Sequence, residues 1–319
     1  MQIKNFILFS FLSLSLVLQG CLDDSESDFD RQVREADELI EAYLSEHQRE
    51  AERQSSGVYI EVVEENESGR QVLADHVVGI VYTMTHLEGE YEIESHSDTL
   101  NPVRFRNFYS HNFNAIYPPG LNYEIGNMKL GETFRFYIPS YRAYGNFGHD
   151  GLFESHSHFI IEVGVVDLMT EDQMYEMEVA EIEQYIEDNE LDAEAYSNGL
   201  QYVTVEEGSG DRPVSHSLVE FHFTRKYLDG TVLRTTEDEE PILTYVNSGE
   251  LVAGLENGLP LIREGGKGIL IMPSRLAFGM SVQILPQQLR DELVETGEFE
   301  PSARPYSPLI YEVELLSVD

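Results

Sequence analysis

The sequence is short of cysteine and of positive charge. Cys21 is its one cysteine, which excludes a disulfide framework and a cysteine-rich zinc site. Lysine and arginine number 20 against 59 aspartates and glutamates, so the formal net charge is −39. A surface this negative repels phosphates, lacks the basic stripe that nucleic-acid binding needs, and does not dock electrostatically on anionic lipid. We therefore expect no nucleic-acid partner.

The apolar run at the N-terminus is too short to span a bilayer as a lone helix. It extends from Phe6 to Leu18, is interrupted only by serines, and follows the positively charged Lys4. The sequence Leu18-Gln-Gly-Cys21 then resembles a bacterial lipobox, which implies cleavage before Cys21 and a diacylglycerol on its thiol. We expect residues 1–20 to be a lipoprotein signal peptide and Cys21 to be the lipidation site that anchors the protein to the membrane. An ordinary secretory signal with an incidental cysteine is the alternative.

Two acidic segments follow the signal. Residues 21–56 read as a solvated acidic tether and then a helix, whose apolar periodicity covers residues 31–50. Residues 169–198 read as an acidic helical linker, with a helical pattern over 171–196. This linker is either a solvated connector with one apolar stripe or a helix that docks a partner in an envelope complex.

An internal repeat organises the remaining chain. Pro139–Gly145 matches Pro273–Gly279 in the order of its proline, serine, alanine, aromatic residue and glycine. Gly131 and Gly265 each precede that proline by eight positions. Shared order and spacing predict a duplicated module, with one domain over residues 57–168 and a second over 199–319. Apolar residues make up 41% of the chain, including 16 Phe and 18 Tyr, which is enough to build a core in each.

Each module is predicted to hold several strands and one short helix. The helices are expected over Asn122–Lys129 and Glu256–Arg263, each ending near a glycine, and Asp229-Gly230 is typical of a hairpin turn. This is an α+β pattern, with a curved antiparallel sheet in each module. Short runs that alternate between apolar and polar residues mark the strands: Val58–Val63, Val77–Thr85, Thr133–Ile138 and Phe159–Val166 in the first module, and Leu200–Val205, Leu218–Tyr227, Gly268–Met272 and Leu309–Leu316 in the second.

The second module resembles FK506-binding-protein-type (FKBP) peptidyl-prolyl isomerases. Gly249–Gly279 is similar to the central stretch of that family, and Pro305–Leu316 is similar to its last strand. Phe221–Thr224 and Asp229-Gly230 fall where its first hairpin belongs. The first module is more diverged and keeps shorter motifs of the family: Val81-Tyr-Thr83, Pro119-Gly-Leu121, Met128–Gly131, Ile138-Pro139, Tyr144-Gly145 and Gly148–Gly151.

The resemblance implies two FKBP-like modules, each a half-barrel sheet wrapped on a short helix, with an apolar pocket between the helix and the inner face of the sheet. Rotation about an Xaa-Pro bond meets a barrier of about 18–20 kcal/mol, because the planar amide is stabilised by resonance. A dry apolar pocket favours the twisted amide, and a donor steadies its carbonyl oxygen. No bond breaks, so the chemistry requires no nucleophile, metal or cofactor.

Carried over residue by residue, the resemblance assigns candidate positions to the first module. Tyr82 lies on the hairpin wall, and Tyr144 falls where the family has its hydroxyl donor. Ile93-Glu94 stands where the family has Phe-Asp if one residue is inserted. The remaining candidate substrate-binding residues are Tyr117 at the pocket edge, Leu121 at the floor where tryptophan is usual, His149 and Phe153 in the loop above, and Ile161 at the base.

The second module keeps more of the apolar scaffold and less of the polar chemistry. Phe278 takes the place of Tyr144 and has no hydroxyl, Arg234 occupies the acidic position, and Leu255 replaces the usual tryptophan in a chain that has none. Phe278 is the module's candidate catalytic residue. Its candidate substrate-binding residues are Phe223, Leu233, Ile242, Leu251, Val252, Leu255 and Tyr311. By burial alone, Leu121, Leu255, Ile161 and Tyr311 are also what any core of this fold would contain.

A long loop in the second module and a pair of histidines in the first are two further candidate features. The loop from Met280 to Arg304 is longer than its counterpart and carries Leu285, Leu289 and Leu293 at a spacing that suits one helix face. It is either a lid or client-binding flap, or a surface insertion. His156 and His158 alternate, a spacing that suits one strand face and a metal pair; two scattered surface histidines are the commoner alternative, and we expect no metal site.

These features predict an outer-membrane lipoprotein of the cell envelope, either periplasmic or surface-exposed, that isomerises prolyl bonds in exported polypeptides. The rival hypothesis is a non-catalytic chaperone or assembly module that uses the same pockets to hold extended apolar segments. A third hypothesis is a subunit of a larger envelope complex, docked through the acidic helices.

Overall fold

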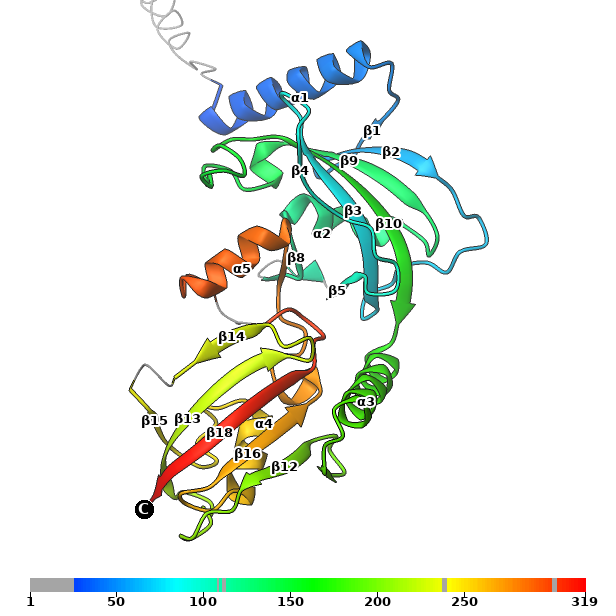
Figure 1. Cartoon of the computed structure of the whole chain (residues 1–319). Helices are drawn as coiled ribbons and strands as arrows, with labels where there is room; N and C mark the ends of the chain where they lie inside the picture. Colours follow the sequence, from blue (N-terminus) through cyan, green and yellow to red (C-terminus); the bar gives the residue numbers. More distant parts are fainter. Residues whose placement is uncertain (1–25, 108, 111–112, 237–239, 300–302) are drawn as a thin grey trace, which may run out of the picture.

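The computed structural model describes residues 26–319 except 108, 111–112, 237–239 and 300–302. The expected signal peptide and Cys21 lie outside the described residues. Two antiparallel sheets, one above the other in Figure 1, form the body of two modules.

The two large sheets have the same strand order. The first runs β1-β2-β9-β10-β3-β4 with β5 also paired to β3, and the second runs β11-β12-β16-β18-β13-β14 with β15 also paired to β13. This identity of topology confirms the duplicated α+β architecture. The first sheet comprises β1 (Glu52–Arg53), β2 (Tyr59–Glu64), β3 (Val77–His86), β4 (Glu92–His96), β5 (Val103–Arg106), β9 (Thr133–Ile138) and β10 (Phe159–Met169). The second comprises β11 (Glu194–Ala195), β12 (Gln201–Glu206), β13 (Leu218–Tyr227), β14 (Val232–Thr235), β15 (Ile242–Tyr245), β16 (Lys267–Met272) and β18 (Leu309–Val318).

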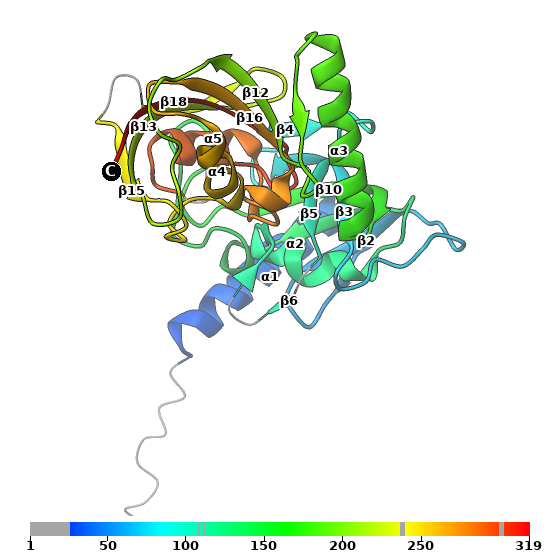
Figure 2. The ribbon, with the colours of Figure 1, turned by 90° about the horizontal axis from the view of Figure 1, so that it is seen from below.

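Each sheet covers one short helix with its apolar face. Every second residue of β13 is buried, as the alternation of its sequence predicts. The helix of the first module is α2 (Pro119–Glu124), continued by the 3-10 turn η1 (Ile125–Asn127), and that of the second is α4 (Ala253–Gly258), continued by η3 (Leu259–Leu261). Figure 2 shows α4 within the curve of the second sheet.

The predicted starts of these two helices were wrong by three residues. The structure begins α2 at Pro119, whose fixed φ suits the first position of a helix, and begins α4 at Ala253. Gly254 allows α4 to approach the sheet closely, because a Cβ atom there would lie 2.1 Å from Sδ of Met272.

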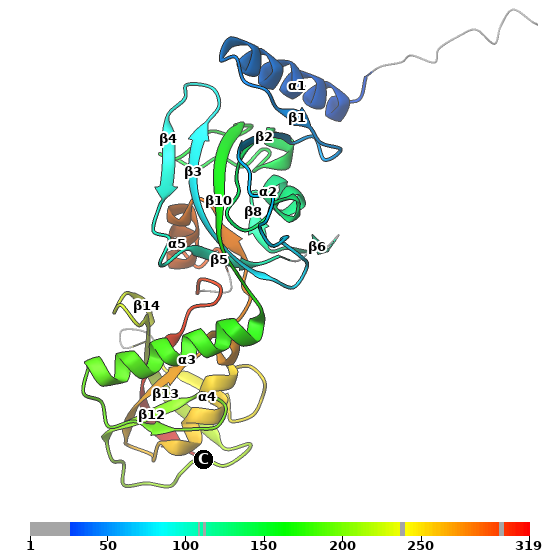
Figure 3. The same ribbon diagram turned by 90° about the vertical axis from the view of Figure 1, so that its right-hand side faces the viewer.

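Two long helices lie outside the sheets (Figure 3). The first, α1 (Asp28–Glu46), begins at the N-cap Ser27 and buries Ile40 and Leu44 against the first sheet. The acidic linker forms α3 (Glu171–Asp188), shorter than the predicted 171–196 because the chain turns into β11. Its apolar stripe packs within the molecule: Met174 clusters with Val77 of β3, and Ile182 clusters with Ile271 and Ile310 of the second sheet. Among the described residues, no helix has the length and apolar character needed to cross a membrane.

The long loop of the second module reaches the first module. It forms β17 (Gln283–Ile284) and α5 (Gln287–Glu295), and β17 pairs in parallel with β8 (Ile116–Tyr117). In Figure 1, α5 lies between the two sheets, beside β8, and it also contacts β14 of its own sheet. The two remaining strands, β6 (Tyr109–Ser110) and β7 (Phe113–Asn114), form a small hairpin just before β8. The interpretation of residues 280–304 as a mere surface insertion was therefore wrong.

Candidate functional site

The candidate residues of the first module gather between α2 and the inner face of its sheet, in what we call the first cleft. Tyr82 on β3, Leu121 on α2 and Ile161 on β10 are buried in one apolar cluster. Phe153 joins them from the loop after β9, and Tyr117 and Tyr144 pack on the cluster's edge. Residues far apart in the sequence thus meet in one apolar cluster.

Tyr144 is held by aromatic rings. It follows the 3-10 turn η2 (Ser140–Arg142), and its ring stacks on Phe153 at 4.9 Å between centroids and meets Phe159 edge-on at 5.9 Å. Its hydroxyl donates a hydrogen bond to the backbone carbonyl of Leu285, which belongs to the long loop of the second module. Burial raises the pKa of Tyr144 well above its ordinary value, so the hydroxyl keeps its proton and remains a donor.

Tyr82 and Glu94 face each other across the β3–β4 hairpin. The Tyr82 hydroxyl donates to the Glu94 carboxylate, and burial, followed by the charge of Glu94, raises the pKa of Tyr82. The same carboxylate accepts hydrogen bonds from the backbone N–H of Gln287 at 2.8 Å and of Gln288 at 3.0 Å. Glu94 therefore satisfies two N–H groups at the start of α5, where a negative charge is stabilised by the helix dipole.

The edge of the first cleft is a short strand that pairs with the same loop. The Leu285 N–H donates to the carbonyl of Tyr117 at 3.0 Å, and the Gln283 N–H donates to that of Ala115 at 2.9 Å. On the opposite side, Nε2 of His149 lies 2.9 Å from a carboxylate oxygen of Glu292 on α5.

Taken together, these contacts place a Leu-Pro dipeptide in the first cleft. Leu285 is fully buried in the cluster that contains Tyr82 and Leu121, and Pro286 is also buried. Tyr144 binds the carbonyl that precedes Pro286, and Glu94 binds the N–H groups that follow it. The arrangement can hold an Xaa-Pro bond in apolar surroundings with one hydroxyl donor on its carbonyl.

The equivalent space in the second module, the second cleft, gathers all the residues predicted for it. Phe223, Leu255 and Tyr311 are buried in one cluster, with the rings of Phe223 and Tyr311 5.4 Å apart. The other predicted members pack on this cluster and are partly buried: Leu233, Ile242, Leu251, Val252 and Phe278. Arg234 extends over the ring of Phe223 at 5.7 Å.

The sequence reasoning missed a buried arginine in the second cleft. Arg225 is 5% exposed, and its guanidinium lies 4.9 Å from the ring centre of Phe278 and 6.0 Å from that of Tyr311. It also donates to the Tyr311 hydroxyl at 3.5 Å. The alternation of β13 could have predicted its burial, because it puts Arg225 on the same face as Phe221 and Phe223.

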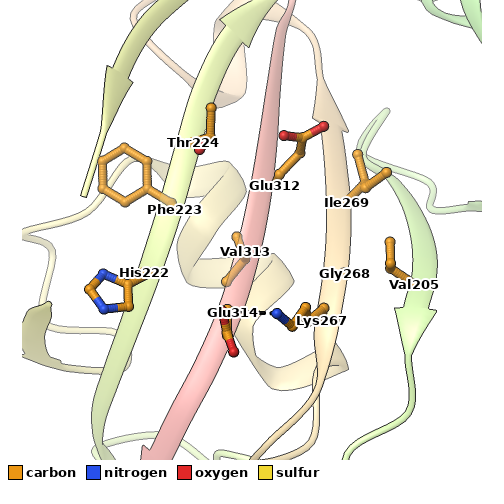
Figure 4. Close-up of a pocket in the computed structure, with 10 residues that line it drawn as sticks. All are labelled: Val205, His222, Phe223, Thr224, Lys267, Gly268, Ile269, Glu312, Val313 and Glu314. Carbon is orange, nitrogen blue, oxygen red and sulfur yellow. Dashed lines mark ion pairs between the residues drawn. The ribbon is translucent and has the colours of Figure 1, made fainter. Parts of the chain in front are cut away.

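The second sheet has another hollow on the face turned away from α4 (Figure 4). It measures about 200 Å³, and Thr224, Ile269 and Glu312 project into it, beside an ion pair of 3.1 Å between Lys267 and Glu314. None of the residues predicted for the apolar cleft except Phe223 lines it.

The alternative in which His156 and His158 share a strand face was wrong. His156 lies in a turn with φ of 63°, and His158 precedes β10 and accepts a hydrogen bond at Nδ1 from the Ser140 N–H at 3.0 Å. Within residues 26–319, the described side chains form no cluster of three or more histidines, cysteines or carboxylates suited to a metal.

Comparison with known proteins gives a family match for the second module. Residues 210–316 match the model of FKBP-type peptidyl-prolyl cis-trans isomerases. Among curated relatives, the macrophage infectivity potentiator of Trypanosoma cruzi is 31% identical over 128 residues, which are 40% of this chain and 57% of that protein. The FKBP-type 22 kDa peptidyl-prolyl cis-trans isomerase of Escherichia coli is 30% identical over 149 residues, 46% of this chain and 64% of that protein. The chain thus spans about three fifths of the length of these relatives.

Similar solved structures include the three FKBP domains of wheat FKBP73, with 18% identity, a TM-score of 0.33, and coverage of 85% of this chain and 99% of that one. FkpA of Escherichia coli has 26% identity, a TM-score of 0.36, and coverage of 47% and 62%.

Proposed function

We propose that the protein isomerises Xaa-Pro bonds in extended polypeptides, on the premise that residues 210–316 match the model of FKBP-type peptidyl-prolyl cis-trans isomerases. The two clefts are the proposed sites. Tyr82, Tyr144 and Phe278 are the proposed catalytic residues, and the other cleft residues are proposed to bind the polypeptide.

One observation carries the proposal: the first cleft holds Leu285-Pro286, with the Tyr144 hydroxyl on the carbonyl of Leu285. The barrier to rotation about a prolyl bond is about 18–20 kcal/mol and arises from amide resonance. The rotated amide has lost that resonance and is less polar at nitrogen, so it is favoured by aromatic and aliphatic walls. A hydroxyl placed on the carbonyl oxygen acts as a fixed donor throughout the rotation.

The test is a refolding reaction that is limited by prolyl isomerisation, measured with increasing amounts of the full chain. We expect the rate constant of the slow phase to rise in proportion to chain concentration. No acceleration by the full chain or by a Pro286→Gly variant, which frees the first cleft of its proline, would refute the proposal.

A non-catalytic chaperone is the second candidate function, and the second cleft favours it. Phe278 has no hydroxyl to donate to a carbonyl, and the guanidinium of Arg225 lies against its ring. Such a cleft retains apolar walls for an extended segment without the donor that Tyr144 supplies. Suppression of aggregation without any change in the slow refolding phase is the result that distinguishes this function.

We further propose that the protein works at a membrane of the cell envelope, anchored through a lipid on Cys21 that is attached after removal of residues 1–20. The lipobox-like sequence before Cys21 supports this. Its exported or envelope clients are proline-containing polypeptides. Incorporation of labelled fatty acid into the full-length chain, lost in a Cys21→Ser variant, is the expected result, and equal labelling of both chains would contradict it.

A further inference from the structure

The long loop of the second module is bound in the first cleft in the way that a polypeptide ligand would be. β17 adds to β8 as an extended strand, with backbone hydrogen bonds from Gln283 to Ala115 and from Leu285 to Tyr117. Ile284, Leu285 and Leu289 are buried in the core cluster of the first module. Main-chain pairing combined with buried alternate side chains is a general mode of peptide recognition.

Polar groups of the first module complete the contact on both sides of Pro286. Tyr144 donates to the Leu285 carbonyl, and Glu94 accepts from the N–H groups of Gln287 and Gln288. His149 meets Glu292 one turn further along α5. Every one of these contacts joins the loop to a residue that the family resemblance assigns to the first cleft.

Most apolar side chains in the described part of the loop pack on the first module. Val282, Leu293 and Phe299 also lie against the first module's cluster, whereas Ala303, at the end of the loop, belongs to the second module's cluster. The two ends of the loop are close together. The Ser281 hydroxyl donates to the carbonyl of Ala303 at 2.8 Å, and the backbone N–H of Tyr306 donates to the carbonyl of Gly279 at 2.9 Å. The loop is therefore an arm closed at its base, with its apolar surface on the other module.

We infer that residues 283–288, Gln-Ile-Leu-Pro-Gln-Gln, are an internal ligand of the first cleft that excludes external prolyl segments until the arm is displaced. This rests on the proposed function of the cleft, which it extends to regulation. A tethered ligand acts at an effective concentration of the order of millimolar, so a polypeptide in dilute solution competes poorly with it. In the second module, α5 and β14 line one hollow, which reaches Leu233 at the edge of the second cleft.

The experiment compares the full chain with two displaced forms. In one, residues 282–302 are replaced by three glycines, which the closeness of Ser281 and Ala303 permits. In the other, Leu285 and Pro286 are both changed to glycine. Glu298→Gln, an exposed change on the same arm, is the matched control. The probe is a fluorescent peptide of residues 283–288, and its binding is followed by anisotropy.

We expect both displaced forms to bind the probe at least about tenfold more tightly than the full chain and the control. The apparent dissociation constant equals the intrinsic one divided by the fraction of clefts that are free, and in the full chain the arm keeps this fraction small. Tyr144→Phe in the displaced forms should remove most of the gain, which assigns the binding to the first cleft. The inference would be overturned if the full chain and the displaced forms bound the probe equally, or if Tyr144→Phe left the gain in affinity unchanged.

Isomerase rates measured on the same proteins separate this inference from the proposed function. If the displaced forms bind the probe more tightly but accelerate no prolyl isomerisation, the internal ligand stands and the proposed catalysis fails. If all forms accelerate isomerisation equally and bind equally, catalysis stands and the internal ligand fails.

Discussion

Leu289→Ala should loosen the arm from the first module and leave the second module intact. Leu289 lies on α5, in the second half of the chain, yet it is 1% exposed and packs in the first module's core. Truncating a buried leucine to alanine costs about 2–5 kcal/mol, and a site between two packed elements is able to collapse, so we take the lower part of that range. A cost of about 2–3 kcal/mol corresponds to an increase of about 30- to 150-fold in the population of the undocked arm.

Native-state hydrogen exchange measures this directly, because it resolves opening by segment. The amides of α5 and those of Gln283 and Leu285 should exchange about 30- to 150-fold faster in the variant, whereas those of β16 and β18 should be unchanged. Leu243→Ala, a change at a leucine that is 63% exposed on β15, is the control and should alter stability by less than about 0.5 kcal/mol. Unchanged exchange in α5, or an equal increase in β18, would refute the assignment of Leu289 to the first module's core.

Two further predictions concern the linker and the second cleft. Burial raises the pKa of Glu178 on α3 to about 7, with Glu181 raising it further and Arg104 and a hydrogen bond from the Ser274 N–H opposing the shift. The protonated form is therefore favoured by folding, so the free energy of unfolding should fall as pH rises from about 5 to 8, by at most about 3 kcal/mol. Glu178→Gln should be the more stable protein at pH 8 in denaturant titrations, and parallel pH profiles for the two proteins would contradict this. Phe278→Tyr should raise the isomerase rate of the full chain about tenfold by supplying the missing donor, since one placed hydrogen bond contributes about 1–3 kcal/mol; an unchanged rate would show that the hydroxyl alone does not activate the second cleft.

The sequence predicted those parts of the fold that depend on local pattern. Alternation located the strands, including Thr133–Ile138 and Leu218–Tyr227 to the residue, because a strand with one buried face must alternate. The starts of α2 and α4 were missed because Pro119 and Ala253 carry no side-chain cap signal before them.

The candidate residues of both clefts also came from the sequence, since the repeat and the resemblance fixed their order. The sequence did not predict that Leu285-Pro286 occupies the first cleft. This contact depends on how the two modules pack, and no local pattern encodes a contact between Tyr144 and Leu285. Arg225 was readable from the alternation of β13, but a charge on a buried face runs against the usual rule for cores.

In this account the first cleft binds an Xaa-Pro bond, and the Tyr144 hydroxyl accelerates its rotation. The most direct test measures the cis-trans exchange of a Leu-Pro peptide by exchange NMR, in the presence of the form in which residues 282–302 are replaced by glycines. We predict that this form accelerates cis-trans exchange and that Tyr144→Phe lowers the acceleration about 5- to 100-fold, as the loss of one placed donor implies. Equal exchange rates with and without the Tyr144 hydroxyl would contradict the account.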